Sequence, residues 1–221
     1  MILDELKVTS DDSVYTEGHI IFLAGRYRSF LLKQRYSTDL KKHIPESNYQ
    51  TICMNLEPVE AIEGLPCIGG YYLRTTEKIP DILPFGINRI YSSGSYYNGD
   101  ITLVSKDRFK YTGYNKWLKN TLYATLDPSN RIYLRSENPQ FMYLESIKFT
   151  GLFENAEKAS EMECESSADD GSCDILDKEF PLEDALVAPM IELITKELSP
   201  SILAPEDKEN NANDELSAVP K

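Results

Sequence analysis

The first apolar pattern along the chain has helical spacing. Between residues 16 and 35, apolar side chains recur at intervals of three and four positions, and Thr16 can cap the N-terminus of a helix there. The positions that make this stripe are Ile20, Leu23, Ala24, Tyr27 and Leu31, with the polar Gln34 continuing it. We therefore expect a helix that ends at about Arg35.

A second helix is predicted after Pro45, because proline is favoured in the first turn of a helix. Ile52, Cys53 and Leu56 would then face inward. Together the two segments predict a small helical bundle over residues 1–60.

The pattern changes after residue 60, where glycine, proline and tyrosine become frequent and apolar residues alternate with polar ones. Alternation predicts strands in "GYYLRTT", "INRIYSS" and "FMYLESIKFTGLF", and a helical turn fits "KDRFKYTGYNKWLKN". Asn98-Gly99 indicates one hairpin turn, and residues 127–130 indicate another. Residues 61–153 are expected to form a small antiparallel, barrel-like β domain, which makes the fold class α+β.

Residues 154–221 form a third region, an extended acidic arm in which residues 154–179 read as linker. Within it, residues 180–198 have helical spacing, and Pro189 predicts a kink or two short helices. Burying eight large apolar side chains contributes on the order of 10 kcal/mol before ordering costs. The helix must therefore dock, either on its own domain or on another chain. The residues expected at an inter-subunit interface are Phe180, Leu182, Leu186, Val187, Met190, Ile191, Ile194 and Leu198.

Charge separates the arm from the rest of the chain. Residues 1–153 carry 18 Lys and Arg against 17 Asp and Glu, whereas residues 154–221 carry 5 against 19, a net charge of −14. An acidic segment repels nucleic acid and is attracted to basic protein surfaces.

A basic face on residues 26–43 is one such surface. Its cations are Arg26, Arg28, Lys33, Arg35, Lys41 and Lys42. On an isolated helix they are an ordinary solvated face. Alternatively, they form the complement of the acidic residues 154–179 reaching over from an adjacent copy.

Motifs for catalysis and cofactor binding do not emerge from the chain: we find no GxGxxG, P-loop, HExxH or GxSxG. We expect no enzyme activity, no cofactor and no metal site. Cys53, Cys67, Cys164 and Cys173 lack zinc-ligand spacing. Cys164 and Cys173 could oxidise outside a cell, but free thiols are expected. The N-terminal residues lack a signal pattern and no apolar run is long enough to span a bilayer, so we expect synthesis in a cytosol and no membrane contact.

Several stretches together resemble a structural protein family of crAss-like bacteriophages, whose members form rings in the portal-proximal tail, the head-to-tail connector. The stretches are "HIIFLAGRYRSFLLKQRYS", "IPESNYQTICMNLEPVE", "IYSSGSYYNGDITLVSKDRFKYTGYNKWLKN", "NPQFMYLESIKFTGLFENAEKA" and "CDILDKEFPLEDALVAPMIELITKEL". They cover most of residues 15–198 in order.

The resemblance implies a non-enzymatic virion component, made in the host bacterial cytoplasm. Copies would form a ring, twelvefold to match a portal, between the portal protein and further tail rings. DNA and cargo proteins would pass through the lumen without sequence-specific binding. Two alternatives stay open: a monomeric binding module whose last helix folds back on its own domain, and a metal-dependent hydrolase that uses the acids of the arm.

Overall fold

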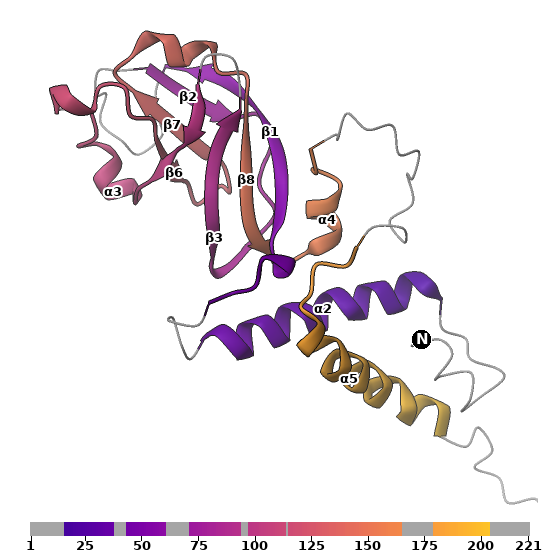
Figure 1. Ribbon diagram of the computed structural model, residues 1–221. Coiled ribbons are helices and arrows are strands. Elements are labelled where there is room, and N and C mark those ends of the chain that lie inside the picture. Colours follow the sequence, from indigo (N-terminus) through magenta and orange to yellow (C-terminus); the bar gives the residue numbers. More distant parts are fainter. Residues whose placement is uncertain are drawn as a thin grey trace, which may run out of the picture.

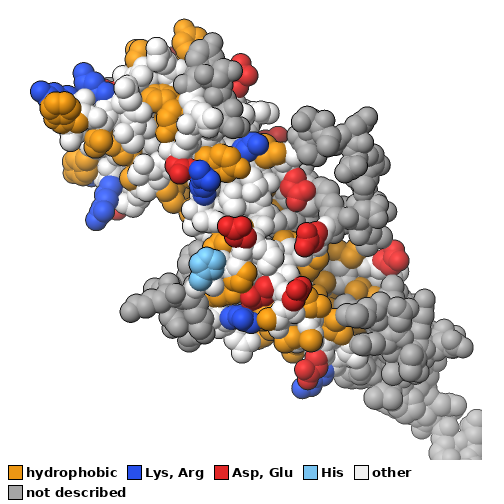
Figure 2. Space-filling model, viewed as in Figure 1, with side chains coloured by type: hydrophobic (Ala, Val, Ile, Leu, Met, Phe, Trp, Pro, Cys, Tyr) orange, Lys and Arg blue, Asp and Glu red, His pale blue; other side chains and the backbone are white. Residues whose placement is uncertain are grey.

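The computed structural model describes residues 16–37, 43–60, 71–93, 97–113, 115–164 and 179–203. It has an α+β architecture: an eight-stranded sheet curls into a barrel, and two long helices pack together below one end of it (Figure 1). In the space-filling view, acidic side chains gather mainly over the half of the molecule that holds these helices (Figure 2).

The strands all belong to the barrel. They are β1 (Gln50–Val59), β2 (Tyr71–Thr75), β3 (Ile82–Ser93), β4 (Asn98–Asp100), β5 (Thr102–Leu103), β6 (Tyr123–Leu126), β7 (Ile132–Ser136) and β8 (Ser146–Phe153). The α-helices are α2 (Glu17–Ser37), α3 (Lys106–Phe109), α4 (Ala156–Ser160) and α5 (Asp184–Leu203). Short 3-10 turns are η1 (Glu46–Asn48), η2 (Lys116–Leu118) and η3 (Pro139–Tyr143).

A single continuous segment brings the barrel close to closure. The strand order is β4-β3-β8-β1-β2-β7-β6-β5, so its two ends, β4 and β5, are neighbours in the chain. Ile101 lies between them and donates its backbone N–H to the carbonyl of Ile90 at 2.8 Å, while Thr102 donates to Leu122 at 3.0 Å. The segment thus leaves β3 on one side and reaches β6 on the other, so it joins the two edge strands and nearly closes the sheet.

The sheet confirms the expected β region, with two differences. Pairing is antiparallel except between β5 and β6, which run parallel. Asn98-Gly99 is not the hairpin turn, because both residues already pair with β3 opposite Ser93 and Ser92. The second hairpin is as predicted: β6 and β7 pair through Leu126 and Ile132, and Asn130 takes a positive φ of 59° in the turn.

The prediction of a helix after Pro45 is wrong. Only the 3-10 turn η1 forms there, and β1 follows as a strand between β8 and β2. Ile52 and Met54 are buried while Cys53 between them is half-buried, which is the period of two that a strand requires. The apolar run is short enough to fit both periods, and pairing with β8 and β2 decided between them. The expected helical bundle over residues 1–60 is therefore reduced, in the described part, to α2 and the turn η1.

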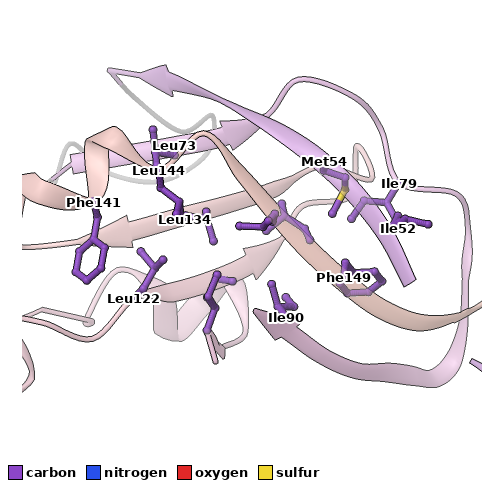
Figure 3. Close-up of a cluster of buried hydrophobic side chains, with 14 of the residues drawn as sticks. Ile52, Met54, Leu73, Ile79, Ile90, Leu122, Leu134, Phe141, Leu144 and Phe149 are labelled. Atoms are coloured by element: carbon purple, nitrogen blue, oxygen red, sulfur yellow. The ribbon is translucent and has the colours of Figure 1, made fainter. Parts of the chain in front are cut away.

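Two large hydrophobic cores are stacked along the molecule, and a smaller cluster surrounds Phe109. The barrel interior is filled from all its long strands, with labelled side chains converging between the strands in Figure 3. The second core lies between α2 and α5, and it takes Leu83 of β3 and Leu152 of β8 into the same cluster. Leu152 is next to Phe153, which faces the barrel core. The end of β8 is therefore buried on both faces, and it joins the barrel to the helices.

The C-terminal region differs from the expected arm. Residues 156–160 form α4, and Glu163 makes an isolated bridge with Ile52, so the segment directly after β8 is folded against β1. Helix α5 begins at Asp184 and continues through Pro189 as one helix. The chain therefore forms one helix here and not the two short helices that Pro189 suggested. Packing against α2 offsets the free energy lost with the one backbone hydrogen bond that proline removes.

Candidate functional site: the helical pair and its junction with the barrel

Helices α2 and α5 form an apolar contact, to which the α5 segment contributes every fourth side chain. Its buried side chains are Leu182, just before the helix, and then Leu186, Met190, Ile194 and Leu198. None is more than 6% exposed, and Ile194 is fully buried. On α2 they meet Ile20, Leu23, Leu31 and Leu32, which confirms the apolar stripe predicted for that helix.

The remaining residues of the proposed interface lie at the border of this contact. Val187 and Ile191 are half-buried, and Phe180 is 38% exposed. Within one chain, therefore, the buried stripe of α5 has α2 as its partner, and the side chains left for another molecule are those three. The assignment of all eight residues to an inter-subunit interface stays a prediction.

The basic face of α2 is paired with the acidic arm of the same chain. Lys33 Nζ lies 2.5 Å from a carboxylate oxygen of Glu154, Arg35 Nε lies 3.3 Å from Glu183, and Arg26 lies 3.9 Å from Glu197. Of these three partners, only Glu154 belongs to residues 154–179, and all three ion pairs lie inside one subunit. Pairing of the basic face with an adjacent copy stays a prediction. Lys41 and Lys42 lie outside the described residues.

Arg28 is not a surface cation but the centre of the junction. Its side chain is fully buried and donates to three backbone carbonyls: Pro181 at 2.6 Å, Phe153 at 2.8 Å and Asn48 at 2.9 Å. Burial lowers the pKa of Arg28 to about 10, which keeps it charged near neutral pH. One guanidinium therefore ties α2 to η1, to the end of β8 and to the segment before α5.

Glu183 extends this junction on the C-terminal side. Its backbone N–H donates to Asn48 Oδ1 at 2.8 Å, and its carboxylate accepts a 2.9 Å hydrogen bond from the Tyr36 hydroxyl. Burial and this hydrogen bond raise the pKa of Tyr36 to about 12. The start of α5 is therefore fixed by polar contacts in addition to its apolar stripe.

A disulfide joins Cys53 of β1 to Cys164, 111 residues later. The expectation of a free thiol at Cys164 is wrong, and its disulfide with Cys53 leaves no sulfur at Cys164 for the pairing considered with Cys173. Backbone contacts bring the sulfurs together, because Cys53 donates its N–H to the carbonyl of Met162 at 2.8 Å. Spacing along the chain holds no signal of such a contact, and Cys173 lies outside the described residues.

Sequence reasoning missed the exposed aromatic side chains. Phe22 and Phe30 are 63% and 52% exposed on the outer face of α2, and Trp117 and Tyr111 are 82% and 67% exposed near α3. A signal was available for the first pair, because Phe22 and Phe30 do not fit the apolar stripe that predicted the helix. Large apolar side chains on the polar face of an amphipathic helix indicate a contact surface.

Among the described residues, no cluster of three or more His, Cys, Asp or Glu side chains could hold a metal ion. Nor does any helix in the searched residues have the length and hydropathy that crossing a membrane requires.

The described residues form a barrel with an attached helical pair, and their exposed aromatic and charged side chains are suited to contacts with other proteins. Residues 1–216 match the family model described as phage tail ring protein 2. Ring protein 2 of Bacteroides phage crAss001 is 52% identical over 217 residues, which is 98% of this chain and 95% of that protein. The chain belongs to the phage tail ring protein 2 family, and the resemblance to crAss-like phage ring proteins is confirmed. It is a structural component of the virion tail.

Proposed function

We propose that this chain forms one ring of the head-to-tail connector, between the portal protein and further tail rings, with the path for DNA and cargo proteins in its lumen. A twelvefold ring would match the portal. The observation that carries the assembly is the exposed pair Phe22 and Phe30 on α2, because the opposite face of that helix is already covered by α5. Exposed aromatic side chains of this size are typical of protein interfaces.

Helix α5 and Phe180, which precedes it, contribute to the ring through the side chains that stay accessible. Phe180, Val187 and Ile191 contact the next subunit, while the buried stripe holds α5 on α2 so that this surface keeps its shape. Contacts between different surfaces of neighbouring copies generate a closed ring when the rotation between them allows closure.

Mass photometry of the purified chain tests this assembly. Deleting residues 179–221 should reduce the size of the rings, and unchanged rings would count against a role for the arm. Because the deletion also uncovers the apolar face of α2, a full-length variant, Val187→Glu with Ile191→Glu, provides the second test. It should assemble poorly while keeping the circular dichroism of the parent chain.

Part of the acidic arm faces the lumen in this proposal. A wall of negative charge repels the phosphate backbone and lets DNA slide through without binding. The net charge of −14 in residues 154–221 supports it. Cryo-electron microscopy of particles with an antibody fragment bound to an epitope tag at the C-terminus tests the location. Density on the outer wall of the tail contradicts the idea.

One observation favours a second function, a monomeric binding module: α5 packs on α2 of its own chain. Sedimentation at micromolar concentration, with and without the portal protein, separates the two, because a connector subunit can stay monomeric until the portal nucleates the ring. A chain that remains monomeric with the portal present, and that is absent from purified particles, is not a ring component.

A further inference from the structure

A groove opens where α2, α4 and the segment before α5 meet. It has a volume of about 280 Å³, and apolar side chains of Ile21, Phe22, Phe180 and Pro181 line it. Four carboxylates also border it, on Glu154, Glu157, Glu163 and Glu179, of which Glu154 is paired with Lys33, and Arg26 is the one basic residue among its lining residues. The groove therefore suits a ligand that presents an apolar side chain surrounded by positive charge.

The segment around α3 and η2 has the opposite charge to the border of the groove. We call this segment, residues 106–119, the basic tip. It carries Lys106, Arg108, Lys110, Lys116 and Lys119 against the single acid Asp107. Trp117 is 82% exposed, and the ammonium groups of Lys116 and Lys110 lie 5.1 Å and 5.0 Å from the rings of Trp117 and Tyr111. A large aromatic side chain flanked by lysines matches the apolar lining and acidic border of the groove.

The tip is held in place by the barrel, so it can present Trp117 without much loss of entropy on binding. Phe109 is fully buried against Tyr72, Tyr123 and Tyr133. The buried Arg135 donates to the carbonyls of Phe109 and Lys110, both at 3.2 Å.

The two surfaces cannot meet within one chain. Figure 1 places α3 on the side of the barrel that faces away from α4, with the helical pair below the other end of the sheet. Basic side chains gather at the first location and acidic ones near the second (Figure 2). Surfaces that are complementary and lie at opposite ends of a subunit connect successive copies head to tail, which is the geometry of a ring.

We propose that the basic tip of one copy docks in the acidic-rimmed groove of the next, with Trp117 seated against Phe22 and Phe180 and with Lys116 and Lys119 facing Glu157 and Glu179. This inference rests on the proposed ring, and it names the contact between its neighbouring subunits.

Carbodiimide cross-linking of a mixture of ¹⁴N- and ¹⁵N-labelled chains tests the contact directly, because the reagent joins lysines only to carboxylates that touch them. The expected peptides link Lys116 or Lys119 to Glu157 or Glu179 and carry one label of each kind. Rings whose links fall elsewhere overturn the docking and leave the ring proposal intact. A chain that gives no mixed-label link at any soluble concentration also overturns it, and composition of purified particles then decides the ring proposal separately.

Charge exchange provides the second test. Lys116→Glu with Lys119→Glu should weaken self-association by about 30-fold, and Glu157→Lys with Glu179→Lys should do the same, whereas all four changes in one chain should restore it. Trp117→Ala should weaken it by a similar factor. Lys78→Glu, an exposed site outside both surfaces, is the matched control. If the tip variants alter DNA binding and not self-association, the tip contacts nucleic acid and the docking is wrong.

Discussion

Arg28 Nε donates a 2.6 Å hydrogen bond to the carbonyl oxygen of Pro181, a residue 153 positions later in the chain. The first helix and the entry to the last one are therefore fixed to each other through a buried cation. Since the same guanidinium also bonds to Phe153 and Asn48, the helical pair and the barrel share one polar anchor.

Arg28→Lys should destabilise the chain by about 3 kcal/mol, although the charge is conserved. A lysine ammonium cannot reach three divergent carbonyls, so buried acceptors and a buried charge lose their partners. Urea denaturation followed by circular dichroism measures the effect. Arg26→Lys is the control: its side chain is 67% exposed, and its replacement should change the free energy of unfolding by no more than about 0.5 kcal/mol. If Arg28→Lys and Arg26→Lys change the free energy of unfolding equally, Arg28 does not anchor the helical pair to the barrel.

The α2–α5 contact predicts a sharp difference between two isoleucines of one helix. Ile194→Ala should cost about 2–5 kcal/mol, because its side chain is fully buried and leaves a cavity. Ile191→Ala should cost clearly less, since that side chain is only half-buried. Thermal unfolding of the two variants at one protein concentration makes the comparison. If Ile191 proves the more sensitive position, α5 is packed through a different face in solution.

Reduction of the disulfide between Cys53 and Cys164 should lower stability by about 2–5 kcal/mol, because the bond closes a long loop and limits the unfolded chain. Urea midpoints with and without dithiothreitol give the value. In the double variant Cys53→Ser with Cys164→Ser, the reductant should have no effect. A drop that persists in the double variant must come from another cysteine.

Because the pKa of Tyr36 is raised, we expect the folded chain to lose stability at alkaline pH. Its pKa is raised from 10.0 to about 12 in the folded chain, so the folded state keeps the phenol proton at a pH where the unfolded state releases it. The contribution of Tyr36 to the free energy of unfolding is fully present below pH 10 and is lost as the pH rises from 10 to 12. Urea midpoints at pH 9 and pH 11 should diverge more for the parent chain than for Tyr36→Phe. Identical pH profiles for both chains would mean that the hydroxyl does not hold its bond to Glu183.

The local sequence pattern predicts some elements of this fold and not others. The stripe of α2, the hairpin at residues 127–130 and the inward residues of α5 were predictable, because each repeats at the period of its own element. The strand β1 was not, since five residues around Ile52 fit either period and only the neighbouring strands select one. The eight expected interface residues were correctly recognised as apolar positions, but their partner could not be inferred from them.

The sequence by itself determined the family, the α+β class, the location of the main amphipathic helices and the concentration of negative charge in the last third. These properties depend on residues near one another in the chain. Tertiary structure alone decided that Arg28 is buried, that Cys53 pairs with Cys164, that α5 lies on α2, and that the basic tip and the acidic groove lie at opposite ends. Each of these depends on contacts between residues more than a hundred positions apart or on the shape of the nearly closed barrel, and no local period encodes such a distance.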